Sequence, residues 1–247
     1  MNKKLFVTLL VLGVLAIDQF IKIWVKTNMN IGDEFDLMGQ YWARIHFVEN
    51  PGMAFGLTFG GNYGKLALSL FRIVAVGLLI YLILRLIRQN QSFGLIACFG
   101  FILAGALGNI IDSAVYGLIF SASPEPFHGG GIAEMFPPDG GYAGFLHGKV
   151  VDMFYFPMWR GTFPSWMPMM GSEPFEFFRP VFNFADASIS VGVFSLLLFQ
   201  RHFFQDEPVA EPVQEESIVA PMDEEETIEP STEIAEASVD TATESEK

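Results

Sequence analysis

The sequence contains little cysteine and histidine, and this scarcity restricts the chemistry open to it. Its single cysteine, Cys98, lies inside an apolar run, which excludes an intrachain disulfide and indicates a thiol used for helix packing. No histidine has the H-E-x-x-H or a comparable ligand spacing; the four are His46, His128, His147 and His202. We therefore expect neither a metal site nor a cofactor.

Charge is also scarce, except near the C-terminus. Charged residues make up 17% of the 247 residues and hydrophobic residues 51%, which is too apolar for an ordinary soluble domain. The net charge of −14 arises in residues 205–247, where 15 acidic residues face Lys247 alone; the other 204 residues hold 13 acidic and 13 basic side chains. The 205–247 segment is rich in Glu, Ala, Thr, Ser and Pro, and we predict a disordered acidic tail.

Long apolar runs are present, and four of them are long enough to cross a bilayer, which takes roughly 20 helical residues for a core of about 30 Å. They are Leu5–Val25, Leu66–Ile87, Phe93–Ile111 and Val181–Phe199. The first run is longer than the core of a usual secretory signal, and no A-x-A-like cleavage site follows it. The sequence therefore predicts an all-α membrane bundle of four transmembrane helices in a domain spanning residues 1–204.

The basic residues predict how this bundle is oriented, because Lys and Arg in short loops are retained in the cytoplasm. With both termini cytoplasmic, the inner segments hold Lys3, Lys4, Arg85, Arg88 and Arg201. Two longer segments, 26–65 and 112–180, then lie outside the membrane.

These two outer segments differ in composition. In the first, the alternating stretch Y-W-A-R-I-H-F-V, Tyr41 to Val48, predicts short strands of a small extracytoplasmic β-element. The second contains an insertion, residues 119–180, with ten Phe, six Met and glycines and prolines that interrupt regular structure. Its aromatic side chains favour the membrane interface, and contact with a substrate or partner is the alternative to simple packing.

Carboxylates and asparagines from separate parts of the chain are predicted to meet at the outer membrane level. Asp186 lies about one turn inside the last span, and the third span ends in G-A-L-G-N-I-I-D with Asn109 and Asp112. Near the outer end of the first span, Asp18 and Lys22 form an i, i+4 pair on one helix face. Polar side chains at such depth usually face a bundle interior or a wet cavity.

This arrangement permits acid–base hydrolysis by two carboxylates. Two carboxyl groups within hydrogen-bonding reach share one proton, so one acts as a base toward water while the other donates to a carbonyl. Nearby asparagines would orient the pair, or the peptide, without adding charge. The alternative function is a small proton-coupled transporter, although transporters generally have more spans and repeat symmetry.

Each candidate also has a structural interpretation. Asp152 would be a solvated loop carboxylate, and Asp186 an acid stabilised by the helix dipole at a helix N-terminus. Asp112 would give hydrogen-bonding support. The Asp18–Lys22 pair would be a neutralised, snorkelling ion pair near the interface.

Five ordered motifs resemble one family. D-Q-F-I-K, E-N-P-G-M-A-F-G, G-A-L-G-N-I-I-D, V-V-D-M-F and F-N-F-A-D together resemble lipoprotein signal peptidase over about residues 5–200. This type II signal peptidase removes the leader from diacylglyceryl-modified bacterial prolipoproteins, amino-terminal to the lipidated cysteine. The resemblance implies an aspartic endopeptidase with Asp152 and Asp186 as its catalytic dyad, placed on the outer face of the bacterial inner membrane.

The resemblance also implies further site residues and partners. By motif position, residues that shape the site or contact substrate are Asp18, Lys22, Asn50, Gly105, Asn109, Asn183 and Ala185, with Asp112 supporting the site. The expected partners are lipid-modified prolipoproteins and membrane lipid. We expect a monomer with no nucleic-acid partner.

The sequence departs from the family pattern in two ways. The family commonly has arginine directly after the G-N-x-x-D aspartate, whereas this chain has Ser113, and Arg72, Arg160 and Arg179 are the candidates to replace that arginine. The connections around the V-V-D motif are also longer than usual, with 39 residues between Asp112 and Asp152 and 33 between Asp152 and Asp186.

Overall fold

The computed structural model describes residues 2–51, 61–124, 130–177 and 179–203. The predicted acidic tail, 205–247, and residues 52–56 of the E-N-P-G-M-A-F-G motif lie outside these ranges. The tail therefore stays a prediction.

Three described helices are long and apolar enough to cross a membrane: α1 (Lys3–Asn28), the Leu66–Arg88 part of α2 (Gly61–Arg88), and the apolar helix that begins with α3 (Phe93–Ile111) and continues to Ile119. They contain the first three predicted spans, and the third helix continues well beyond the predicted end at Ile111. Asn2 caps α1 by accepting a hydrogen bond from the Lys4 amide, and Ser92 caps α3 in the same way from the Leu95 amide.

The fourth predicted span begins too early in the sequence. Residues 181 and 182 form strand β6 (Val181–Phe182), and helix α5 (Phe184–Phe203) begins only after Asn183. Backbone pairing of β6 with another strand takes these apolar residues out of the helix. The apolar part of α5, Phe184–Phe199, is shorter than the three long helices.

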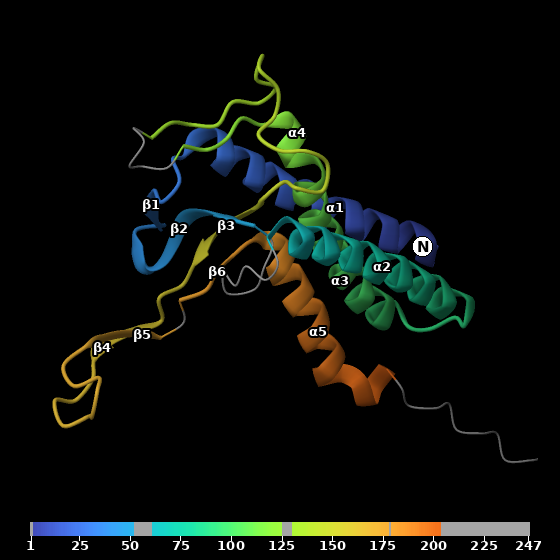
Figure 1. The fold of residues 1–247 in the computed structure, drawn as a ribbon. Helices are drawn as coiled ribbons and strands as arrows, with labels where there is room; N and C mark the ends of the chain where they lie inside the picture. Colours follow the sequence, from blue (N-terminus) through green and yellow to red (C-terminus); the bar gives the residue numbers. More distant parts are fainter. Residues whose placement is uncertain (1, 52–60, 125–129, 178, 204–247) are drawn as a thin grey trace, which may run out of the picture. The chain divides into compact units, whose positions relative to one another are not determined.

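Helix α3 is the common packing partner of the bundle, because α1, α2 and α5 all pack on it (Figure 1). Close approach of α3 and α5 depends on glycine. A Cβ at Gly105 would lie 2.2 Å from the Ala185 carbonyl oxygen, and one at Gly192 would lie 2.5 Å from the Cys98 carbonyl oxygen. Cys98 is itself buried, as the packing interpretation predicts. The outward faces of the helices expose large apolar side chains such as Leu12, Val74 and Phe194.

A four-stranded antiparallel sheet adjoins these helices, with strand order β1-β2-β3-β6 (Figure 1). Strands β1 (Glu34–Leu37) and β2 (Gln40–Asn50) come from the first predicted outer segment, and β3 (Val150–Tyr155) comes from the second. Along β2 the buried side chains alternate as Ala43, Ile45 and Phe47, which confirms the predicted strand. The insertion thus supplies regular structure as well as breaks, because its apolar run V-V-D-M-F-Y pairs with β2.

Two further parts of the second outer segment are ordered. After Ile111 the chain forms a π-helical turn, η2 (Asp112–Tyr116), and the short helix α4 (Gly117–Ile119). Beyond β3, strands β4 (Trp159–Thr162) and β5 (Pro174–Phe177) form a separate antiparallel hairpin. Trp166 and Met169 in its connection are exposed; whether they meet lipid, substrate or partner stays a prediction.

Candidate active site

The polar residues predicted to converge are contributed by four neighbouring elements. Asn109 lies in the last turn of α3, and Asp112 begins η2, a π-helical turn of the kind that often marks functional sites. Asp152 lies in β3, paired opposite Val48 of β2, and Asp186 lies in the first turn of α5. Asp152 and Asp186, which have 33 residues between them in the sequence, are thereby brought to the same region.

Asn183, between β6 and α5, joins the two carboxylates. Its side-chain amide donates to Oδ1 of Asp152 at 2.7 Å, and its backbone amide approaches Oδ2 of Asp186 at 3.4 Å. The Asp186 backbone amide donates in return to Oδ1 of Asn183 at 3.0 Å, which closes the turn that begins α5. Asn183 is fully buried, so its hydrogen bonds define the orientation of both acids.

The remaining oxygens of the pair contact other amides. Asn109 donates to Oδ1 of Asp186 at 2.8 Å, and Asn50 donates to Oδ2 of Asp152 at 3.2 Å. Asn183 also donates to the side-chain oxygen of Asn109 at 3.1 Å. The predicted asparagines therefore surround the two acids and supply donors to both.

Asp152 is 4% exposed, and its environment favours the protonated acid. Burial raises the pKa of Asp152, and the nearby charge of Asp186 raises it further, to about 7. The amides of Asn183 and Asn50 and the Lys22 charge act in the opposite direction but do not offset these effects. Asp152 thus keeps its proton up to about pH 7, whereas an ordinary carboxyl group is ionised above about pH 4.

A second buried cluster lies beside this pair and is centred on the Lys22 ammonium group. Lys22 contacts Asp112 at 2.7 Å and Asp18 at 3.0 Å, and donates to the side-chain oxygen of Asn109 at 3.0 Å. Lys22, Asp18 and Asp112 are each 0% exposed. The Asp18–Lys22 pair is thus an ion pair, as the structural interpretation has it, but it is buried in the protein and does not snorkel. Through Asn109, this cluster is connected to Asp186.

Two members of this cluster were missed from the sequence, Gln19 and Tyr116. The Gln19 amide donates to Asp18 at 3.1 Å and to Asp112 at 2.9 Å, and the Tyr116 hydroxyl donates to the Gln19 side-chain oxygen at 3.1 Å. Gln19 could have been found, because it lies three residues before Lys22 in D-Q-F-I-K and therefore near the same helix face. Tyr116 could not, since its position depends on the π-helical turn.

Small residues bring the helices close enough for these contacts. The Ala185 backbone amide donates to Oδ1 of Asp18 at 2.8 Å, so α1 provides an acceptor for the first turn of α5. A Cβ at Gly108 would lie 2.6 Å from Oδ2 of Asp18, and Gly105 faces the Ala185 carbonyl. Gly105 and Ala185, two of the positions implied by the family resemblance, are therefore in direct contact between α3 and α5.

A third polar cluster, also missed from the sequence, supports β2 next to Asn50. Glu49 pairs with Lys26 of α1 and, at 3.0 Å, with Lys149, while Ser123 donates to it at 2.8 Å. Burial alone would raise the pKa of Glu49, but the charges of Lys26 and Lys149 bring it below its ordinary value. The cluster links α1, β2 and the start of β3.

The position of the commonly found family arginine is filled by a buried serine. The Ser113 hydroxyl donates to the Asn109 carbonyl at 3.0 Å, which adds a contact to the last turn of α3. Of the three candidate replacements, Arg72 of α2 is acted on electrostatically by Asp186, Asp112 and Asp152. Arg179 is exposed, and the side chain of Arg160 lies outside what the structure describes.

Chemically, the described site offers two carboxyl groups, several amide donors and buried cations. Within the described ranges, no three His, Cys, Asp or Glu side chains are grouped as ligands for a metal ion. One protonated and one ionised carboxyl group are the requirement for activating water and protonating a carbonyl oxygen without a covalent intermediate.

Comparisons with known proteins agree with this chemistry. A family model described as signal peptidase (SPase) II matches residues 10–202. A lipoprotein signal peptidase of Porphyromonas gingivalis is 53% identical over 193 residues, covering 78% of this chain and 81% of that protein. One from Amoebophilus asiaticus is 36% identical over 81% of this chain and 77% of its own length.

A solved structure, described as a bacterial membrane enzyme at 2.3 Å resolution, shares the fold. Its TM-score is 0.50 at 20% identity, over 82% of this chain and 92% of that chain. The family match covers most of the chain and includes every element that contributes to the candidate site. This chain belongs to the signal peptidase II family.

Proposed function

We propose that Asp152 and Asp186 together hydrolyse the signal peptides of lipoprotein precursors. As a member of its family, the chain is an aspartic-type signal peptidase of a bacterial membrane. The observation that carries the assignment of the dyad is Asn183, which is hydrogen-bonded to both acids, together with the pKa of about 7 for Asp152.

In the proposed mechanism Asp186 is the base and Asp152 the acid. Oδ2 of Asp186, whose described partner is the 3.4 Å contact to the Asn183 amide, takes a proton from water as that water attacks the scissile carbonyl carbon. Asp152 gives its proton to the carbonyl oxygen, which forms a tetrahedral diol. Asp186 then protonates the leaving amine while a diol hydroxyl returns a proton to Asp152, and the carbon–nitrogen bond breaks.

The surrounding residues orient this pair in the proposal. Asn183, Asn109 and Asn50 hold the carboxyl groups by hydrogen bonds. Lys22, held by its ion pairs with Asp18 and Asp112, donates a hydrogen bond to the side-chain oxygen of Asn109 and so orients the Asn109 amide toward Asp186. Arg72 supplies the positive charge that the family arginine would have provided at Ser113, supported by its electrostatic interaction with both acids of the dyad.

The substrate, we further propose, is anchored in the bilayer by the acyl chains of its diacylglyceryl cysteine. Each buried methylene contributes about 0.8 kcal/mol, so the lipid supplies much of the affinity. The peptide bond before the cysteine then lies at the dyad. An unlipidated precursor should be a poor substrate, and equal cleavage of lipidated and unlipidated forms would contradict this part.

Membrane topology also belongs to the proposal. We assign four spans with α5 as the fourth, both termini in the cytoplasm and the dyad on the outer face of the inner membrane. Two observations support this topology. Helix α5 packs along α3, and basic residues lie at the N-terminal end of α1 (Lys3, Lys4) and at the C-terminal end of α2 (Arg85, Arg88), which is the pattern of cytoplasmic ends. We propose that the enzyme acts as a monomer, because one chain supplies both acids and the amides that are hydrogen-bonded to them.

The experiment that tests the dyad compares wild type, Asp152→Asn and Asp186→Asn in cells expressing a lipidated precursor. Asp139→Asn is the matched control, because Asp139 is an exposed acid of the same outer segment. We expect normal leader removal by wild type and the control, and none by the two dyad variants. A proton-coupled transporter would cleave the precursor in none of the four, and cleavage by either dyad variant would contradict the assignment.

A further inference from the structure

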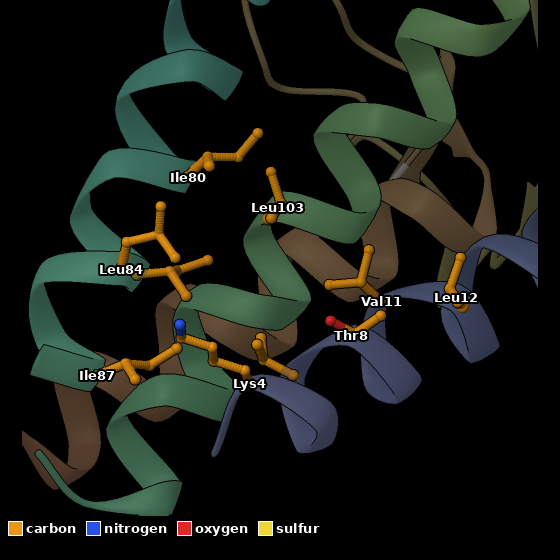
Figure 2. Close-up of a pocket in the computed structure, with 10 residues that line it drawn as sticks. Lys4, Thr8, Val11, Leu12, Ile80, Leu84, Ile87 and Leu103 are labelled. Atoms are coloured by element: carbon orange, nitrogen blue, oxygen red, sulfur yellow. The ribbon is translucent and has the colours of Figure 1, made fainter. Parts of the chain in front are cut away.

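An apolar groove lies between α1 and α2, over the surface of α3, and it is separate from the dyad (Figure 2). Its volume is about 320 Å³. Buried side chains form its floor: Val7, Val11, Ile83 and Leu103. Its walls are exposed, with Leu12 of α1 57% accessible and Leu84 of α2 40% accessible. The groove is therefore open along its length to whatever surrounds the helices.

One end of the groove is cationic. Figure 2 shows the Lys4 side chain extending from α1 toward α2. Arg88 lies one turn beyond Leu84 on the same helix row and is exposed. Among the described residues, no carboxylate pairs with either side chain, and residues 2–17 and 66–111 contain no acid at all. Lys3, by contrast, is hydrogen-bonded to Asn90.

We propose that this groove binds one acyl chain of an anionic phospholipid, whose phosphate contacts Lys4 and Arg88. From Lys4 to Leu12 the groove follows eight helical residues, or about 12 Å at 1.5 Å per residue. This length matches most of one leaflet, which is about 15 Å of hydrocarbon. The occupant thus has its charge at the membrane surface and its chain among Val7, Val11 and Leu103.

Charge and polarity favour a lipid over two other occupants. The leader of a precursor carries a positively charged region before its apolar core, and Lys4 and Arg88 would repel that region. The 205–247 segment of this chain has the right charge but is rich in Glu, Ser and Thr, and burying such residues in an apolar groove is unfavourable. An anionic phospholipid satisfies both the charge and the apolar lining.

The test measures binding of palmitoyl-oleoyl phosphatidylglycerol and phosphatidylcholine to the purified full-length chain in detergent, by native mass spectrometry. Wild type should retain phosphatidylglycerol preferentially. Lys4→Gln should weaken that binding about fivefold, the equivalent of about 1 kcal/mol for one basic residue near an anionic headgroup. Leu84→Trp, which fills the groove, should reduce binding of both lipids.

Arg85→Gln is the matched control, because Arg85 has the same charge at the same end of α2 and does not line the groove. At about 100° per residue it points about 100° away from groove-lining Leu84, whereas Arg88 lies only about 40° from Leu84. It should bind phosphatidylglycerol as wild type does. An equal loss in Lys4→Gln and Arg85→Gln would overturn the proposal in favour of a general surface charge, and unchanged binding in Leu84→Trp would exclude the groove. Displacement of phosphatidylglycerol by a synthetic leader peptide would make the groove a leader site. Retained leader cleavage shows that each variant is folded, and it separates this inference from the proposed catalytic role.

Discussion

The proton held by Asp152 predicts how activity depends on pH. The mechanism needs Asp152 protonated, and its pKa is about 7 because the carboxyl group is buried and lies near Asp186. Raising the pH through 7 removes the proton, so the leader-cleavage rate should fall on the alkaline side. The fall should appear in kcat, because the same acid must be protonated in the complex with substrate.

The size of the fall follows from a single ionisation. With a pKa of about 7, the protonated fraction is about 90% at pH 6 and about 9% at pH 8, so kcat should decrease roughly tenfold between these values. The assay is multiple-turnover cleavage of one lipidated precursor at saturating concentration in nanodiscs, at constant ionic strength. A kcat that stays level from pH 6 to pH 8, with the protein still folded, would refute the reasoning.

Stability offers an independent measurement of the same proton. The pKa of Asp152 is raised in the folded chain, so the stability that its protonation contributes is fully present below the unfolded pKa of about 4 and is lost as the pH rises to about 7. The loss is about 1.4 kcal/mol per pH unit across this window, or roughly 4 kcal/mol at most. Asp152→Asn should remove this slope from thermal unfolding, and an identical slope in variant and wild type would contradict the raised pKa.

Other contacts give three further predictions. Gly105→Val should lower the melting temperature and abolish cleavage, because the valine side chain would collide with the Ala185 carbonyl oxygen and separate α3 from α5. The free energy of unfolding should fall by about 1–3 kcal/mol or more. Lys22→Met should destabilise by about 3–5 kcal/mol in chemical unfolding, since Asp18 and Asp112 would be left buried without their cation. Glu49→Gln should reduce kcat by loosening β2 next to the dyad, and an unchanged kcat would show that this cluster is purely structural.

The sequence predicted the helices well because each depends on local composition. Apolar length alone located α1, α2 and α3, and the i, i+4 spacing predicted that Asp18 and Lys22 share a helix face, as they do. Helix direction and the rise per residue also predicted that Asn109 and Asp186 lie at the same depth in the bundle, and the two side chains are indeed hydrogen-bonded. Their catalytic or supporting roles stay predictions.

Long-range pairing could not be predicted in the same way. Strand β3 pairs with β2 roughly 100 residues earlier in the chain, and no local pattern encodes that register. The same pairing explains why residues 181 and 182 join the sheet instead of the last span. The Glu49 cluster was missed for a related reason, since Lys26, Ser123 and Lys149 are distant from Glu49 in the sequence and contact it, or each other, only through the tertiary fold.

The hydrogen bond from the Ala185 amide to Asp18 joins residues 167 positions apart and connects α5 to α1. A ribosome makes Asp18 early and Ala185 almost at the end of the membrane domain. In a nascent chain, Asp18 therefore remains without this partner until α5 has been made. Under the proposed assignment, a copy that stops before α5 contains Asp152 but not Asp186, so it lacks one of the two acids that hydrolysis requires.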